Sequence, residues 1–236
     1  MQLKTQPPSF FVTGTDTEIG KTLVSSALIY AMTQQGWKSV GMKPVAAGAE
    51  LVNGVWCNED VLALKAVSNL DRLDELDTFI NPYLFKLAAA PHIAAEQEQR
   101  QIDLKLILQR YQTLASHAQA MIVEGVGGFR VPLNAIEDSA DMAQQLNLPV
   151  VLVVGMRLGC ISQALLTAEA IAARGLRLAG WVANSAQQEM SYLQENLSAL
   201  RLRLNAPLLG CIPHLTNPDA AQAAKFLELT ALFREG

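Results

Sequence analysis

The fold is indicated by one stretch near the N-terminus, Ser9-Phe10-Phe11-Val12-Thr13-Gly14-Thr15-Asp16-Thr17-Glu18-Ile19-Gly20-Lys21-Thr22. Its apolar residues 10–13 predict a short buried strand, and a helix is expected to begin at Lys21. The loop between them is bounded by Gly14 and Gly20, which allow the backbone to approach a bound group closely. Because the N–H groups and the dipole of a helix N-terminus favour negative charge, this arrangement predicts a cradle for phosphate groups.

The spacing within this loop differs from the common P-loop pattern. Five residues separate Gly14 from Gly20, whereas the usual motif, Gly-x-x-x-x-Gly-Lys-Ser/Thr, has one fewer. Lys21 can reach the β- and γ-phosphates of a nucleotide, and the Thr22 hydroxyl can bind Mg²⁺. The structural alternative is a helix start that reads Gly-Lys-Thr by chance, but the order of strand, loop and helix favours a nucleotide site.

Composition narrows the class of protein. The chain has 236 residues, of which 50% are hydrophobic and 17% charged, and its formal net charge is −4. A chain of this length can bury most of its surface in one core, so residues 1–236 are expected to form a single α/β domain. The mild acidity offers no basic face, which argues against nucleic acid or a membrane surface as a partner.

The cysteines and the first residues indicate the compartment. Cys57, Cys160 and Cys211 lie far apart, with no Cys-x-x-Cys or Cys/His metal spacing, which fits a reducing environment. Residues 1–9 lack the apolar core of a signal peptide, and the longest apolar runs have the length of strands. The sequence therefore predicts a cytoplasmic protein.

Apolar runs of strand length alternate with amphipathic segments of helix length, which predicts a mostly parallel, doubly wound sheet with P-loop NTPase topology. The predicted strands are residues 10–13, 39–43, 120–124, 150–155, 178–183 and 208–212. The predicted helices are residues 21–35, 59–68, 103–118, 139–146, 160–174, 190–204 and 219–233. In such sheets ligands bind at the carboxyl ends of the strands, so the residues that follow each strand are the candidates for chemistry.

Three charged residues, at strand ends or at a helix start, are candidates for the site. Glu124 ends a strand and is followed by Gly125-Val126-Gly127-Gly128, so its carboxylate is expected beside the P-loop, where it can hold Mg²⁺. Asp60 opens a predicted helix, and Lys43 ends a strand before Pro44. Taken singly, each also fits a structural role. Glu124 can be an acid at a turn, Asp60 can be an acid in the first turn of a helix, and Lys43 can be a solvated lysine.

At this point the chain resembles the dethiobiotin synthetases of the biotin pathway, whose P-loop carries the same additional residue. The resemblance covers nearly the whole chain. The further motifs that carry it, in family order, are Gly41-Met42-Lys43-Pro44-Val45-Ala46-Ala47-Gly48, Asn58-Glu59-Asp60, Asn81-Pro82-Tyr83, Pro91-His92, Val123-Glu124-Gly125-Val126-Gly127-Gly128, Leu148-Pro149-Val150, Leu158-Gly159-Cys160-Ile161, Gly180-Trp181-Val182-Ala183-Asn184 and Ala206-Pro207-Leu208-Leu209-Gly210.

The resemblance implies an ATP-dependent cyclo-ligase. Such an enzyme closes the ureido ring of dethiobiotin from a 7,8-diaminononanoate-type diamine, CO₂ and ATP, through a carbamate and a carbamic-phosphoric mixed anhydride. It implies Lys43 and Lys21 as catalytic residues and Thr22, Asp60 and Glu124 as ligands of Mg²⁺. It also implies a homodimer with substrate bound across the interface.

Further residues are carried over from the same resemblance. Asn184 matches the family's adenine-reading asparagine, whose amide can donate to N7 and accept from the exocyclic amine. The implied ATP-binding residues are Glu18, Ile19, Gly20, Lys21, Thr22, Leu23, Asp60, Glu124, Gly125, Val126, Gly127, Asn184, Pro213, His214, Leu215 and Asp219. The implied substrate-binding residues are Thr17, Lys43, Ala47, Gly159, Cys160 and Ile161.

Three other functions are alternatives to this one. Ala47 stands where the family commonly has serine, which leaves open a related ligase acting on a different diamine. A switch or partitioning ATPase usually carries a second lysine five residues before the P-loop lysine, but that position here is Asp16. A GTPase is disfavoured because Asn184 is followed by Ser185 and no Asn-Lys-x-Asp motif follows any strand.

Overall fold

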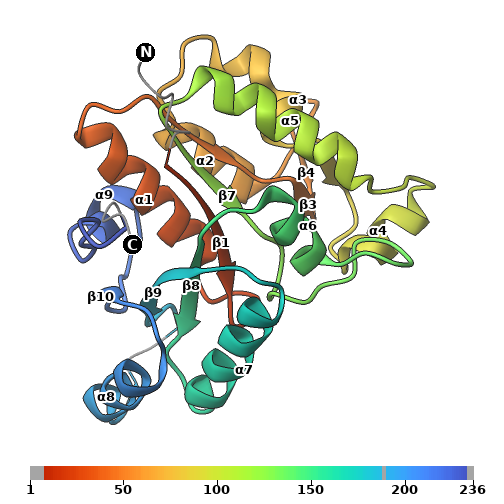
Figure 1. The fold of residues 1–236 in the computed structure, drawn as a ribbon. Coiled ribbons are helices and arrows are strands. Elements are labelled where there is room, and N and C mark those ends of the chain that lie inside the picture. Colours follow the sequence, from red (N-terminus) through yellow and green to blue (C-terminus); the bar gives the residue numbers. More distant parts are fainter. Residues whose placement is uncertain (1–7, 188–189, 233–236) are drawn as a thin grey trace, which may run out of the picture.

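A central sheet of six parallel strands organises the chain (Figure 1), and its order is β10-β9-β8-β1-β7-β2. The computed structural model describes residues 8–187 and 190–232. The strands are β1 Ser9–Gly14, β2 Ser39–Met42, β7 Ala120–Glu124, β8 Val150–Gly155, β9 Leu178–Asn184 and β10 Leu208–Ile212. Each coincides with a strand predicted from the sequence, and the predicted parallel, doubly wound sheet is confirmed.

Helices cover both faces of this sheet because successive strand side chains point to opposite sides. In β1, Phe10 and Val12 pack with α1, α2 and α9 on one face, and Phe11 packs with α5 and α6 on the other. In β8, Leu152 and Val154 pack with α7 and α8. The helices are α1 Lys21–Gln34, α2 Glu59–Val67, α3 Asp77–Ile80, α4 Pro91–Gln97, α5 Leu104–His117, α6 Ser139–Leu146, α7 Cys160–Ala173, α8 Leu193–Arg203 and α9 Ala220–Ala224, with the 3₁₀ turn η1 Leu73–Leu76.

The segment between β2 and β7 contains short strands that the sequence analysis did not predict. β3 Val45–Ala47 pairs in parallel with β6 Tyr83–Phe85, and β4 Glu50–Val52 forms an antiparallel hairpin with β5 Val55–Cys57. The hairpin turn is Asn53-Gly54, and both residues have positive φ, 51° and 82°. Asn-Gly between two strands is a strong hairpin signal, so this element was detectable, whereas three-residue strands give too little periodicity to find alone.

The predicted helix over residues 219–233 is wrong over most of its length. Helix α9 ends at Ala224, and Leu227 then forms an antiparallel bridge to Gly210 on the edge strand β10. The backbone approaches so closely that a Cβ on Gly210 would lie 2.0 Å from the Phe226 carbonyl oxygen. Pairing with the sheet edge therefore replaces helix here, and residue 233 lies outside the described residues.

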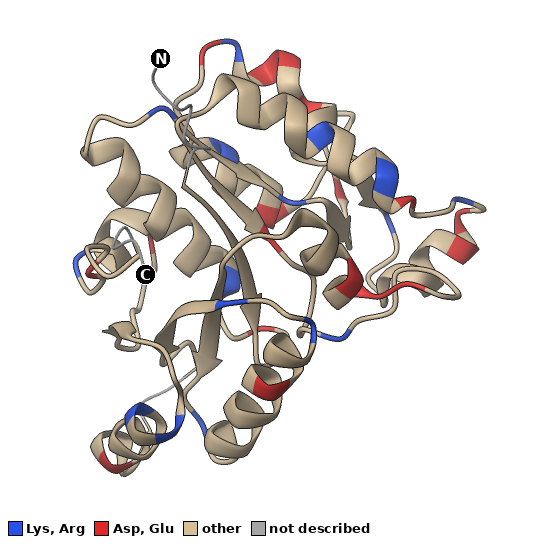
Figure 2. Cartoon of the chain, in the orientation of Figure 1, with Lys and Arg blue, Asp and Glu red and all other residues tan. Residues whose placement is uncertain are grey.

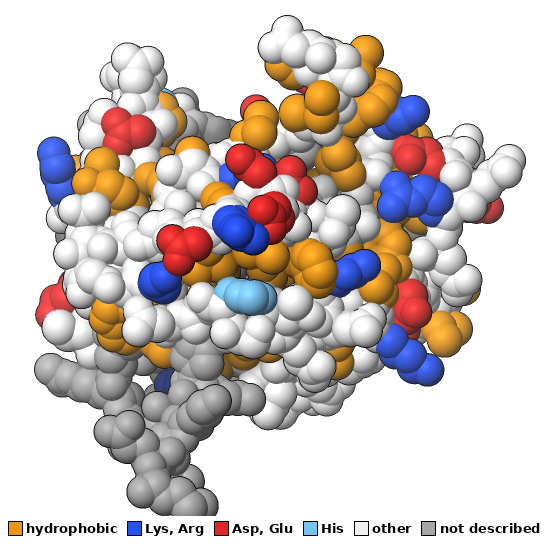
Figure 3. Space-filling model, turned by 90° about the horizontal axis from the view of Figure 1, so that it is seen from above, with side chains coloured by type: hydrophobic (Ala, Val, Ile, Leu, Met, Phe, Trp, Pro, Cys, Tyr) orange, Lys and Arg blue, Asp and Glu red, His pale blue; other side chains and the backbone are white. Residues whose placement is uncertain are grey.

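Positive, negative and hydrophobic side chains are mixed over the surface. Figure 2 shows Lys and Arg interspersed with Asp and Glu over the outer helices and loops. On the face seen in Figure 3, charged side chains of both signs alternate with hydrophobic ones. Within the described residues, no helix has the length and apolar character needed to cross a membrane.

Candidate active site

The P-loop joins β1 to α1 in the predicted manner. Gly20 occupies the N-cap of α1 with φ 81°, the left-handed region that favours glycine. A Cβ there would lie 2.2 Å from Nδ2 of Asn184. Glycine is thus required both by the backbone angle and by the neighbouring side chain. Since Gly20 has no side chain to cap the helix, the first N–H groups of α1 suit an anion.

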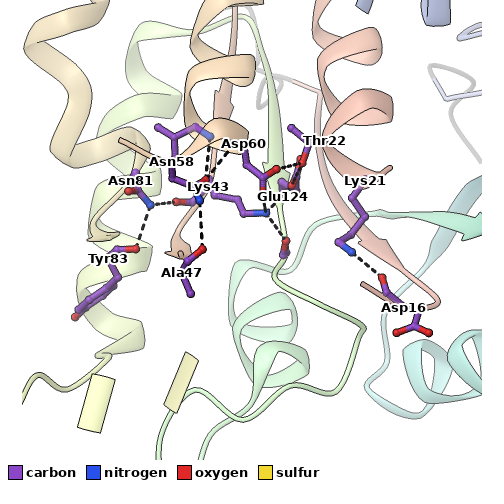
Figure 4. Close-up of polar contacts among 12 residues, drawn as sticks. Asp16, Lys21, Thr22, Lys43, Ala47, Asn58, Asp60, Asn81, Tyr83 and Glu124 are labelled. Atoms are coloured by element: carbon purple, nitrogen blue, oxygen red, sulfur yellow. Dashed lines mark hydrogen bonds and ion pairs between the residues drawn. The ribbon is translucent and has the colours of Figure 1, made fainter. Parts of the chain in front are cut away.

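Lys21 lies folded over this loop. Its Nζ donates to the carbonyl oxygen of Asp16 at 2.7 Å (Figure 4), and the residue is buried. Burial, together with the nearby charge of Lys43, lowers the pKa of Lys21 to about 8. A buried ammonium held by one carbonyl is well placed to bind phosphate oxygens.

Thr22, Asp60 and Glu124 come from three different elements and meet at one point. Thr22 is the second residue of α1, Asp60 lies in the first turn of α2, and Glu124 ends β7. The Thr22 Oγ1 lies 2.6 Å from Asp60 Oδ1 and 2.8 Å from Glu124 Oε1. The structure therefore brings together the two carboxylates and the hydroxyl that sequence reasoning assigned to one site.

Lys43 lies between the same two carboxylates. Its Nζ is 2.5 Å from Glu124 Oε1, 2.8 Å from Asp60 Oδ2 and 3.2 Å from the Gly125 carbonyl oxygen. Burial by itself would lower the pKa of Lys43, but the charges of Glu124 and Asp60 and their hydrogen bonds outweigh it and raise that pKa. Burial would likewise raise the pKa of Asp60, but Lys43 and Thr22 hold it below its ordinary value.

Two asparagines fix the backbone around these charged groups. Asn58 is the N-cap of α2, where its side chain accepts from the N–H groups of Asp60 and Val61. Asn81 Nδ2 donates to the carbonyl oxygen of Lys43 at 2.6 Å (Figure 4). Both residues belong to motifs of the family resemblance, but no role was predicted for either. The Asn58 cap had a signal, an asparagine directly before an acidic first turn, whereas the contact of Asn81 has none.

Asn184 lies at the end of β9 against the P-loop. Its Nδ2 donates to the Ile19 carbonyl oxygen at 2.7 Å, and its buried Oδ1 has no partner among the described residues. An adjoining cavity is lined by Glu18, Ile19, Gly155, Met156, Arg157, Asn184, Ala186 and Gln187. The free Oδ1 is an acceptor suited to the amino group of a base, and the Ile19 carbonyl engages one of the two N–H groups of the amide.

The other residues expected around the adenine base of the nucleotide lie in the segment after β10. His214 Nδ1 lies 3.2 Å from the carbonyl oxygen of Ala186, a lining residue of the cavity described above. Asp219 caps α9, accepting from the N–H of Gln222 at 2.7 Å. The structure thus links His214 to the cavity and gives Asp219 a structural role, while contact of Pro213, Leu215 and Asp219 with nucleotide stays a prediction.

The residues expected to bind the substrate lie in two places, at the end of β3 and at the start of α7. Ala47 ends β3, and its carbonyl oxygen accepts from Asn58 Nδ2 at 3.3 Å. Gly159, with φ 93°, is the N-cap of α7, which begins at the buried Cys160. An ion pair between Arg157 and Asp16 ties the loop before α7 to the P-loop.

Burial raises the pKa of the Cys160 thiol, which disfavours the reactive thiolate form. The contacts of Thr17, Lys43, Ala47, Gly159, Cys160 and Ile161 with substrate stay predictions.

The residues present fit a magnesium ion. Within the described residues there is no cluster of three or more His, Cys, Asp or Glu side chains suited to a metal. The candidate set instead combines two carboxylates with the Thr22 hydroxyl, and all of these are oxygen ligands of the kind Mg²⁺ prefers. Oε2 of Glu124 is buried without a partner among the described residues, which is the state expected of an oxygen that awaits a ligand.

Comparison with known proteins places the chain in a family. A family model described as an AAA domain matches residues 8–222. The ATP-dependent dethiobiotin synthetase BioD of Aromatoleum aromaticum is 55% identical over 226 residues, which is 95% of this chain and 99% of that protein. The protein of the same name from a Janthinobacterium species is 51% identical over 226 residues, 94% of each chain. The chain belongs to the dethiobiotin synthetase family.

Solved structures show that the fold of this dethiobiotin synthetase family member is shared more widely. A ParA family ATPase from Chlorobium tepidum matches with a TM-score of 0.60 at 14% identity, over 98% of this chain and all of that one. The MinD cell division protein of Aquifex aeolicus matches with a TM-score of 0.52 at 14% identity, over 92% and 93% of the two chains. At this identity the likeness concerns the fold alone.

Proposed function

We propose that this enzyme converts 7,8-diaminononanoate, CO₂ and ATP into dethiobiotin, ADP and phosphate, with Mg²⁺ as cofactor. The observation that carries the proposal is the buried Lys43, whose ammonium lies within hydrogen-bond distance of both carboxylates beside the P-loop. A second buried lysine next to Lys21 supplies positive charge for a reaction in which two anions, a carbamate and the γ-phosphate, must come together.

The proposed reaction has three steps. One amine of the substrate attacks CO₂, forms an N–C bond and loses a proton, which gives a carbamate. A carbamate oxygen then attacks the γ-phosphorus and ADP departs, leaving a mixed anhydride. The second amine attacks the carbamate carbon, the C–O bond to phosphate breaks, and the amine loses a proton as the ring closes.

The residues act mainly by electrostatics and positioning. Lys21 and the N–H groups from Glu18 to Leu23 bind the phosphates, and Lys43 binds the carbamate and γ-phosphate oxygens while charge is transferred between them. Magnesium, held by Thr22, Asp60 and Glu124, neutralises phosphate charge when bound. Gly125, Val126 and Gly127 line the phosphate side, and Asn184 reads the adenine.

The assembly and the compartment are parts of the same proposal. The active unit is a homodimer, in which the start of α7 at Gly159 binds the remote carboxylate of a substrate held by the other subunit. The enzyme works in the cytoplasm, which agrees with three free cysteines.

Mixing variant subunits tests the shared site. Lys21→Ala subunits are combined with Gly159→Glu subunits, each inactive alone, and exchange of subunits should restore activity. No recovery of activity would favour a site confined to one chain.

Release of ADP tests the reaction itself. Purified protein with Mg²⁺ and ATP should release ADP only when the diamine and bicarbonate are both present, and omission of either should reduce release to background. Rapid release without the diamine would instead favour a switch ATPase. Diamines of other chain lengths belong in the same assay, because Ala47 removes a hydroxyl from the substrate side and leaves a related diamine as the alternative substrate.

A further inference from the structure

Lys43 contacts the same carboxylates that are proposed to bind the metal. Its Nζ contacts Oε1 of Glu124 and Oδ2 of Asp60, while Thr22 contacts the other oxygen of Asp60 and the same Oε1. Of the four carboxylate oxygens, three are therefore engaged by protein groups, and only Oε2 of Glu124 has no partner among the described residues. Figure 4 shows these side chains converging on one point.

The charge of this cluster disfavours a free cation. Two carboxylates and one ammonium leave a net charge of only −1, and the side chain of Lys43 is 4% exposed, so water screens it poorly. A divalent cation that binds Asp60 and Glu124 must approach this ammonium closely, in surroundings of low dielectric, or displace it. In the absence of nucleotide, no phosphate offers the displaced ammonium a new anionic partner.

A nucleotide changes this balance. Its terminal phosphates bring several negative charges next to Lys21 and the P-loop, and an ammonium leaving the carboxylates can pair with a phosphate oxygen instead. The same movement brings Lys43 to the anion on which it is proposed to act. Binding of the metal and placement of the catalytic lysine thus become a single event.

We propose that Lys43 makes this carboxylate pair selective for the metal–nucleotide complex and excludes the free divalent cation. The inference rests on the proposed function for the assignment of Thr22, Asp60 and Glu124 to the metal. Lys43 is therefore a determinant of which form of the metal the site accepts, in addition to its role in turnover.

Binding of Mn²⁺, followed by electron paramagnetic resonance in nucleotide-free protein, tests this selectivity without any measurement of activity. Wild-type protein should leave Mn²⁺ free, and Lys43→Met should bind one ion at least about tenfold more tightly. Lys21→Met serves as the comparison, because Lys21 contacts a carbonyl and acts on the carboxylates only through its nearby charge; it should tighten Mn²⁺ binding less than Lys43→Met does. Equal Mn²⁺ affinity in wild type and Lys43→Met would overturn the inference.

Further measurements separate this inference from the metal assignment. Adding Glu124→Gln to Lys43→Met should abolish the new Mn²⁺ site; if the ion still binds, the assignment of ligands itself is wrong. Lys43→Gln guards against a local packing defect, and circular dichroism together with ADP binding verifies that each variant is folded. Wild-type protein given Mn²⁺ and a non-hydrolysable ATP analogue should bind the ion, and failure to do so would also contradict the inference.

Discussion

The side-chain oxygen of Asn58 accepts a hydrogen bond from the backbone N–H of Asp60 at 3.1 Å. The amide nitrogen of the same side chain donates to the carbonyl oxygen of Ala47 at 3.3 Å. Asn58 therefore ties the strand on the substrate side to the helix turn that carries a metal carboxylate. A residue that holds both segments should affect how the site binds metal as well as how stable the fold is.

We expect Asn58→Ala to raise the Mg²⁺ concentration needed for half activity and to lower the free energy of unfolding by about 1 kcal/mol, the usual effect of a lost N-cap. Asn58→Ser keeps a capping oxygen but loses the donor to Ala47, so it should recover stability more than metal affinity. Asp103→Ala, which removes the N-cap of the remote helix α5, is the matched control. It should cost similar stability without changing the Mg²⁺ dependence, and an equal Mg²⁺ effect would assign Asn58 a purely structural role.

Substitutions of Lys21 and Lys43 should impair different steps of the reaction. Lys21→Ala should chiefly weaken nucleotide binding, measured by calorimetry with ADP, because Lys21 lies against the P-loop backbone. Lys43→Ala should chiefly reduce turnover, since its interaction with the transferring charge strengthens toward the transition state. Near-normal kcat in Lys43→Ala would show that Lys43 does not act on the reacting groups.

The Mg²⁺ dependence of activity should show whether the carboxylates of the site are metal ligands or structural acids. Glu124→Gln and Asp60→Asn each remove one negative charge from an oxygen-ligand site, so both should raise the Mg²⁺ concentration needed for half activity. Glu59→Gln is a suitable control, since Glu59 also lies in the first turn of α2 and has no role in the proposed site. If neither variant shifts the Mg²⁺ dependence, both acids are structural.

The sequence predicted the parts of the molecule whose signals are local. Long apolar runs predicted every strand of the main sheet, and the P-loop together with the strand-end rule placed Glu124 beside Thr22 correctly. The failures are tertiary in origin. Residues after Ala224 have a helical pattern, but an unpaired edge of β10 and a glycine that permits close approach stabilise the alternative pairing.

The arrangement of Lys43 shows the same limit at the site. Its position after a strand predicted proximity to the P-loop, but no periodicity or motif indicates that its ammonium lies between two carboxylates. That contact depends on how α2 is set against β7, which is determined by packing of Leu64 in the core and by the Asn58 cap. Local patterns therefore predict which residues share a site, and long-range packing decides how they pair.

The last prediction concerns stability in acid. Asp138 and Asp141 form a capping box at the start of α6, in which Asp141 accepts from the Asp138 N–H at 2.8 Å and also pairs with Arg174. Burial works to raise the pKa of Asp141, but the Asp138 N–H and the Arg174 guanidinium outweigh it and hold that pKa below its ordinary value of 3.8. The folded state thus binds this proton less readily than the unfolded chain.

The sign of the pH dependence follows from this lowered pKa. The stabilisation from ionised Asp141 is complete above the unfolded pKa and is lost as the pH falls through the lower folded pKa. Asp141→Asn should therefore be less stable than wild type at pH 7, by about 1 kcal/mol, and the difference should shrink below about pH 4 in urea unfolding experiments. Asp71→Asn, which breaks the exposed pair with Lys38, should change stability little and lose even that effect in high salt. A wild-type advantage over Asp141→Asn that stays constant down to pH 3 would mean that the carboxylate charge contributes nothing at this helix start.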